Sequence, residues 1–432
     1  MPVVDSLRQL LALLLSYGFL LLANGLFTTL LSLRGGLEGF SALLTGVVMS
    51  CYYLGLFLGA RYAALVVNQV GHIRAFGVFA SLLSVTPLIH MLLVSPALWV
   101  VLRVVAGFSM AGLIVVTESW INARAENSNR GTILSIYMFI NYLCAGCAQL
   151  LLMLDDPGGF RLFTLASIVF SFSLIPVLLT RTQAPLPEAP GALKITPVLR
   201  ASPVGFFGAM AAGLINASFY TMGPLFATGV GFELDDISLF MALGILGGLA
   251  LQTPIGKLSD RIERRAVIAT VGLGVALCCL TLVLLSRSGM TVNGFLLGSF
   301  VYGSLSLTLY SLSGAHANDW GDPARRMQTS GALLAGFGIG AVVGPLLAGW
   351  LMGWMGPSGL FAFNGAVALA LALFALAHAF RPRRRAKVPF VPQPAAQFTS
   401  EQLYNAAQQE REQEAATAAA DGGVSEGRDS GR

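Results

Sequence analysis

Two ionisable side chains, Arg103 and Glu118, lie inside one apolar stretch at residues 96–120, which is long enough to cross a lipid bilayer. A charge at the centre of a membrane costs about 2.5 to 3.5 kcal/mol on insertion scales, so such residues are expected to have a function. Arg103 could attract an anionic group, and Glu118 could carry a proton once its carboxyl group is removed from water. Fifteen residues of helix would separate them by about 22 Å, so they cannot form an ion pair with each other.

Both coupling candidates, Arg103 and Glu118, have a structural alternative. Arg103 could bond the carbonyl groups at the outer end of its helix. Glu118 could hold a basic residue on the cytoplasmic side, such as Arg130.

Uncharged polar residues in other apolar stretches are candidates for lining a solute cavity. For each of them, a hydrogen bond between neighbouring helices is the competing interpretation. The candidates are Asn24 in the first stretch, Asn141, Tyr142 and Gln149 in the fifth, and Asn216 and Tyr220 in the seventh.

The composition is that of a membrane protein with many spans. Of the 432 residues, 55% are hydrophobic and 11% charged, and the mean hydropathy is +0.74. The apolar stretches are continuous, which indicates helices and not the alternating strands of a barrel. All five cysteines fall inside them, so we expect no disulfide framework, no metal and no cofactor. The net charge of +5 comes without a nucleic-acid motif, which leaves the bilayer as the expected partner.

The apolar stretches predict an all-α membrane protein with twelve membrane-spanning helices. The first stretch is longer than the apolar region of a signal peptide, so we expect it to be retained. The predicted spans are 8–31, 41–66, 73–94, 96–120, 131–154, 161–181, 203–228, 237–256, 266–286, 291–315, 330–353 and 358–380.

The predicted spans divide into two six-helix bundles, at residues 1–181 and 203–380. Residues 182–202 contain four prolines and read as a cytoplasmic linker. Residues 381–432 form a tail that is first basic and then polar, and we expect it to be disordered.

The distribution of lysine and arginine predicts the orientation. Counted as far as Lys387, eighteen of these residues fall in the loops and ends of one side and three in those of the other. Because cytoplasmic loops are rich in Lys and Arg, both termini are expected in the cytoplasm and the protein in the inner membrane.

Two pairs of features recur at nearly constant offsets, which indicates that the halves are copies of one unit. The loop at residues 68–72 stands 192 residues before residues 260–264. Asn122 and Arg130 stand 196 residues before Asn318 and Arg326.

The loop at residues 256–265, GKLSDRIERR, is expected to form a tight turn between the eighth and ninth spans. Its Gly256, Asp260, Arg261, Arg264 and Arg265 resemble the loop signature of the major facilitator superfamily, with Glu263 where that signature has glycine.

Other segments extend this resemblance over residues 8–380. Residues 115–119 (VVTES), 129–131 (NRG) and 218–225 (SFYTMGPL) are similar to the YcaD-type branch of the superfamily, and Arg103 to Gly107 resembles its R-x-x-x-G motif. The resemblance implies that the loop residues, with Arg130 and Arg326, gate the change of conformation. It also implies that Asp260 sits at the N-terminus of the eleventh span, where the helix dipole favours an anion.

The function that follows from this resemblance is secondary active transport of a small organic solute by alternating access, in a monomer. We expect coupling to protons, and export as one direction of transport. The alternative is a receptor or sensor of the same fold that binds a solute without moving it. No phosphate-binding loop of an ATP-driven pump and no protease motif occurs, so an enzyme is not expected.

Overall fold

The structure is a computed structural model that describes residues 2–124, 130–179, 195–288, 291–321, 326–379 and 390. All regular elements in these ranges are helices. In chain order they are α1 (Pro2–Leu37), α2 (Ala42–Val70), α3 (His72–Leu92), α4 (Pro96–Arg124), α5 (Arg130–Leu150), η1 (Leu151–Leu154), α6 (Arg161–Phe172), α7 (Leu174–Leu178), α8 (Ile195–Ala201), α9 (Pro203–Gly229), α10 (Leu234–Arg261), α11 (Arg264–Ser288), α12 (Val292–Ser306), α13 (Leu309–Trp320), α14 (Arg326–Met355) and α15 (Gly359–Ala379).

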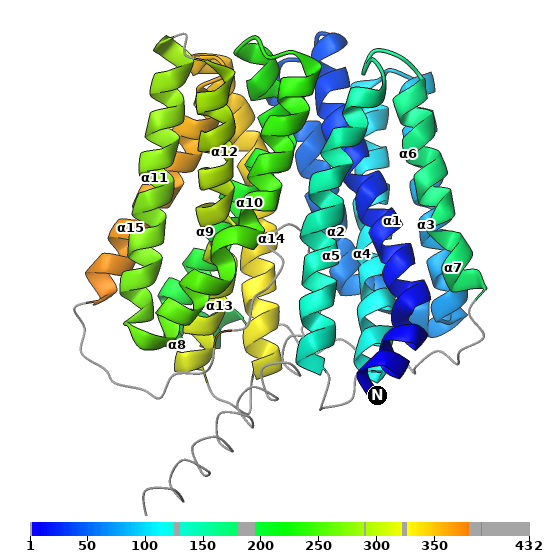
Figure 1. Ribbon diagram of the computed structural model, residues 1–432, viewed down its shortest axis with the longest axis horizontal. Coiled ribbons are helices and arrows are strands. Elements are labelled where there is room, and N and C mark those ends of the chain that lie inside the picture. Colours follow the sequence, from blue (N-terminus) through cyan, green and yellow to red (C-terminus); the bar gives the residue numbers. More distant parts are fainter. Residues whose placement is uncertain are drawn as a thin grey trace, which may run out of the picture.

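Twelve helical spans in the described ranges are long and apolar enough to cross a membrane, which confirms the predicted number. They stand side by side, and α15 ends on the side where α1 begins, the lower side of Figure 1. We call this the terminus side. The sixth span is interrupted at Ser173, and the tenth at Leu307 and Thr308.

Two expectations were too simple. The stretch at residues 256–265 is not a turn throughout, because α10 continues to Arg261 and only Ile262 and Glu263 separate it from α11. The ladder of backbone hydrogen bonds runs past the apolar run into the charged residues, which have good helix propensity. The tail is not wholly without packed structure, because Phe390 is buried. Residues 182–194 of the expected linker lie outside the described residues, and α8 forms in its remaining part.

Each bundle is closed by a reciprocal pair of glycine contacts, which we call its glycine clasp. In the first bundle, a Cβ on Gly55 would overlap the carbonyl oxygen of Val104, and one on Gly107 would overlap that of Tyr52. These two glycines therefore let the backbones of α2 and α4 touch, as small residues do between membrane helices.

The second bundle has the same clasp, in which Gly247 faces the carbonyl oxygen of Phe300 and Gly303 faces that of Gly244. The offsets from the first clasp are 192 residues for α2 and α10 and 196 residues for α4 and α12. They equal the offsets of the sequence repeat.

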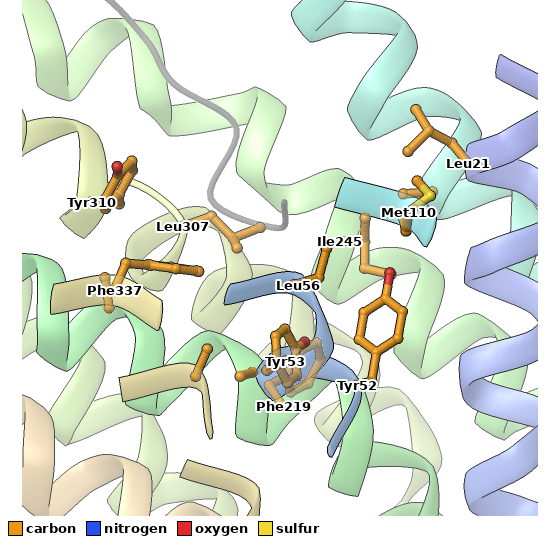
Figure 2. Packing of buried hydrophobic residues seen from close by; sticks show 14 of the residues in the cluster. Leu21, Tyr52, Tyr53, Leu56, Met110, Phe219, Ile245, Leu307, Tyr310 and Phe337 are labelled. Carbon is orange, nitrogen blue, oxygen red and sulfur yellow. The ribbon is translucent and has the colours of Figure 1, made fainter. Parts of the chain in front are cut away.

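The bundles meet along two equivalent seams. Helix α2 packs on α14 and helix α5 packs on α10, while α1 contacts α9 between the seams. On the α2–α14 seam, Gly46 lies against the carbonyl group of Pro345. One cluster of buried apolar side chains runs through both bundles, and Figure 2 shows members from each, such as Tyr53 and Leu56 beside Phe219 and Ile245.

Candidate functional site

Arg103 is fully buried in α4, and its guanidinium group has no hydrogen-bond acceptor among the described residues. Its Cζ atom lies 4.3 Å from the centre of the Tyr52 ring and 5.9 Å from that of Phe27. A cation over an aromatic ring gains about 2 kcal/mol when water is excluded, whereas burying an ion costs several kcal/mol. The aromatic contacts therefore offset only part of the cost, and the alternative of bonds to helix-end carbonyls is not observed.

His90 is also buried, beside the aromatic residues that surround Arg103. Its Nδ1 donates to the carbonyl oxygen of Thr86 at 2.7 Å, and its ring lies edge-on to Phe27 with centroids 5.3 Å apart. Trp99, one turn before Arg103, packs against both His90 and Phe40. The position of His90 near the end of a span is typical of an interfacial histidine, but the side chain is fully buried.

Glu118 lies buried at the other end of α4 in a line of polar side chains. The Tyr137 hydroxyl donates to its Oε1 at 2.8 Å, and the Tyr137 ring stacks on Tyr17 with centroids 4.7 Å apart. Asn141 donates to the Tyr17 hydroxyl at 2.7 Å. The line therefore joins Glu118 in α4 to one of the predicted cavity residues through α1 and α5. The side chain of Arg130, the predicted clamp partner, is outside the described residues.

Two predicted cavity residues, Asn24 and Gln149, form hydrogen bonds to neighbouring helices. Asn24 accepts a hydrogen bond from Tyr52 at 3.0 Å. Gln149 accepts one from Thr29 of α1 at 2.6 Å and donates to the carbonyl of Gly25, also in α1, at 3.5 Å. These geometries match the competing interpretation of interhelical hydrogen bonds.

Asn216 and Tyr220 differ from them, because their polar side-chain atoms are buried without a hydrogen-bond partner in the described part of the chain. They lie one turn apart on α9. The neighbours that act electrostatically on the Tyr220 hydroxyl include Tyr142 of α5 and Tyr53 of α2. Both belong to the other bundle. Tyr142 and Tyr220 thus approach each other from opposite bundles, and Asn216 lies one turn before Tyr220 on α9.

On the terminus side, Arg264 joins three helices of the second bundle. It donates to Asp260 of α10 at 2.7 Å and pairs with Asp319 of α13 at 2.8 Å. In the first bundle the corresponding position is His72, whose Nε2 is 2.9 Å from the Ser119 hydroxyl. A hydrogen bond thus stands where the second bundle has an ion pair.

Arg265 reaches a fourth helix, donating to the carbonyl of His378 at the end of α15. Its Cζ atom also lies 4.2 Å from the centre of the Trp320 ring. Arg261 is exposed in the last turn of α10. The side chain of Arg326 lies outside the described residues.

Phe390 lies against the same end of α10. Its backbone N–H donates to the two carboxylate oxygens of Asp260 at 3.1 and 3.2 Å, and its ring fills the space where a Cβ on Gly256 would stand. The expected position of Asp260 at the start of the eleventh span involves side chains that are not described. The observed contacts tie Asp260 to Arg264 and to the tail.

A pocket of about 460 Å³ opens on the side opposite the termini. Its walls come from both bundles, with Leu33 and Phe40 on one side and Leu225 and Met352 on the other. Phe40 is in turn the neighbour of Trp99, with ring centroids 5.1 Å apart. The pocket wall is thereby connected through Trp99 to the helix turn that carries Arg103.

Some surrounding residues were not among the predicted candidates. Phe27, Tyr52 and Tyr17 look like ordinary apolar filler in the sequence, and only the fold brings them to Arg103 and Tyr137. The sequence offered one weak signal for these aromatic residues: some of them lie in spans that also carry a polar candidate. Within the described part of the chain, no three His, Cys, Asp or Glu residues are grouped so as to hold a metal ion.

The family model of the Major Facilitator Superfamily matches residues 13–288 and 205–411 of this chain. The chain therefore belongs to this superfamily of membrane transporters, as the loop signature indicated.

Curated relatives agree. An MFS-type transporter of Enterobacter sp. (strain 638) is 28% identical over 372 residues, covering 85% of this chain and 95% of the relative. The MFS-type transporter YcaD of Escherichia coli O17:K52:H18 (strain UMN026 / ExPEC) is 26% identical over 374 residues, covering 86% and 96%. The resemblance to the YcaD-type branch is thereby confirmed.

Solved structures show the same fold. A crystal structure of a point mutant of the nucleoside transporter NupG has a TM-score of 0.71 at 14% identity, covering 86% of this chain and all of that one. A bacterial homologue of the human lysosomal transporter Spinster, in an inward-facing and occupied conformation, has a TM-score of 0.70 at 15% identity, covering 88% and 96%.

Proposed function

We propose that the protein is a monomeric secondary active transporter that carries a small organic solute between its two bundles by alternating access. The observation that carries this proposal is the Tyr220 hydroxyl, which has no hydrogen-bond partner among the described residues and faces Tyr53 and Tyr142 of the other bundle. Asn216, one turn away on α9, also has no partner for its side-chain amide there, and the two bundles meet along equivalent seams. Polar groups left unpaired in a membrane interior favour a binding partner, and a boundary between two symmetric halves can open to either side.

Proton coupling is part of the proposal and is assigned to Glu118. It is a buried carboxyl group, and the stacked Tyr137 and Tyr17 connect it to Asn141. A proton taken up at Glu118 changes the charge at one end of this line and so can affect how the bundles pack. Export is the direction we propose.

The test is a screen for uptake and efflux in proteoliposomes, with and without an imposed pH gradient. Gradient-dependent movement of at least one solute is expected, and counterflow without a gradient should also occur. Saturable binding with no movement in either direction would indicate the receptor alternative instead.

The inner membrane and cytoplasmic termini are proposed from the excess of Lys and Arg on the terminus side. A reporter enzyme that is active only in the periplasm, fused after Arg432, is expected to be inactive. The matched control places the same reporter in the loop between α1 and α2, at Gly39, where it should be active. The opposite pattern would invert the proposed orientation.

The proposed gating role of Asp260 predicts that Asp260→Asn shifts the carrier towards the state open to the cytoplasm. The carboxylate holds both Arg264 and the Phe390 backbone, while Arg264 keeps its ion pair with Asp319, so folded protein should be retained. The measurement is labelling of single cysteines placed on each face. Glu263→Gln is the matched control. This neighbouring acid is half-exposed, and its nearest approach to Arg265, 3.8 Å, is too long for a hydrogen bond. Equal labelling of Asp260→Asn and wild type would refute the gating role.

A further inference from the structure

Arg103 is a buried cation that forms no ion pair with any acidic side chain described in the first bundle. Glu38 pairs with Arg34, Asp155 pairs with Arg161, and Glu118 is fifteen residues further along the continuous helix α4, about 22 Å away. None of the carboxylates paired among the described residues is paired with Arg103.

The contacts that Arg103 does make leave its donors uncommitted. A cation over a ring uses the charge of the guanidinium group but none of its five N–H bonds. Nε, Nη1 and Nη2 are all buried without an acceptor among the described residues. A planar fork of buried donors is suited to a carboxylate, which can accept two parallel hydrogen bonds.

The repeat shows that the fold does not require a charge at this place. The offset of 196 residues that relates α4 to α12 takes Arg103 to Ser299. The Ser299 hydroxyl is satisfied by the carbonyl oxygen of Phe240 at 2.7 Å. The second bundle thus fills the equivalent position with a small side chain whose hydrogen bond is made, and the cation is specific to the first bundle.

We propose that Arg103 binds the carboxylate of the transported solute, so that the solutes of this transporter are organic anions with an apolar body. Phe27 and Tyr52 form the aromatic walls against which such a body packs, and the Trp99 turn lies between Arg103 and the pocket on the far side. This assignment of the substrate class rests on the transport function proposed above.

The test compares three carboxylates with their uncharged amides on the purified full-length protein: acetate and acetamide, benzoate and benzamide, indole-3-acetate and indole-3-acetamide. At least one carboxylate is expected to raise the thermal unfolding midpoint above that seen with its amide, because a ligand that binds only the folded state stabilises it. In Arg103→Gln the affinity for that carboxylate should fall about tenfold or more, to the level of the amide.

Arg61→Gln is the matched control, since Arg61 also lies over a tyrosine ring, at 5.6 Å from the Tyr62 centroid, but is exposed. It should keep the preference for the carboxylate. Should Arg103→Gln not fold, Arg103→Lys takes its place, because it keeps the charge and loses the fork of donors, and it should bind the carboxylate more weakly than wild type does. Equal response of the wild type to all acids and amides, or unchanged affinity in the Arg103 variants, would overturn the proposal.

Counterflow of the same labelled compounds in proteoliposomes separates this inference from the proposed function. A carboxylate that binds through Arg103 but is not exchanged would support a carboxylate site at Arg103 and contradict the transport of that compound. Exchange of amides and acids at the same rate, unaffected by Arg103→Gln, would support transport and contradict the inference.

Discussion

Replacing Gly107 by valine is expected to abolish the accumulation of folded protein. A Cβ at this position would overlap the carbonyl oxygen of Tyr52, so α2 and α4 would have to separate along the glycine clasp. Overpacking of a core costs about 1 to 3 kcal/mol, and a clash with backbone belongs at or above the upper end of that range because a backbone cannot change rotamer. The measurement is the monodisperse fraction after detergent extraction, followed by thermal unfolding.

Gly77→Val is the matched control for this prediction. Gly77 lies within α3 and nothing is found within 4 Å of the position its Cβ would take, so this variant should lose only a small amount of stability. Gly303→Val in the second clasp should fail as Gly107→Val does. A folded Gly107→Val protein with wild-type stability would contradict the role of the clasp.

Replacing Glu118 by glutamine is expected to remove accumulation against a gradient while exchange of solute across the membrane continues. The amide keeps the shape and can still accept from Tyr137, but it cannot take up a proton. With one proton per solute, a pH difference of one unit supports about tenfold accumulation, and the variant should lose all of it. The measurement is the ratio of inside to outside solute in proteoliposomes.

Tyr137→Phe is the control that separates the proton from the hydrogen bond. It removes the donor to Glu118 but leaves the carboxyl group and the ring that stacks on Tyr17, so coupling should persist. Full accumulation by Glu118→Gln would exclude this residue from coupling. Loss in Arg130→Ala equal to that in Glu118→Gln, with no further loss in the double variant, would indicate that Glu118 holds Arg130.

The twelve spans could be predicted from the sequence because the length and continuity of an apolar run reflect the thickness of the bilayer directly. The residues at which the helices end were harder to predict. The helical hydrogen-bond ladder does not stop at the membrane boundary, so α10 runs on to Arg261 through residues that the hydropathy pattern assigned to a turn.

The surroundings of the candidate residues could be predicted only in part. That Arg103 and Glu118 cannot meet follows from the helix rise alone, whereas the neighbours of Arg103 come from α1 and α2, and no local pattern specifies them. The same holds for Phe390, whose partner Gly256 is far away in sequence. Asn24 is satisfied because the fold brings Tyr52 beside it, whereas Asn216 finds no hydrogen-bond partner among the described residues, and the sequence does not distinguish the two.

The two glycine clasps also carry a record of ancestry. Two copies of one duplicated segment have kept the same backbone contacts at offsets of 192 and 196 residues, since no other residue fits where helix backbones touch. Side chains outside the clasps have diverged, as at Arg103 and Ser299 and at His72 and Arg264. Duplication thus accounts for the symmetry of the two bundles, and later changes of single side chains made their interiors chemically different.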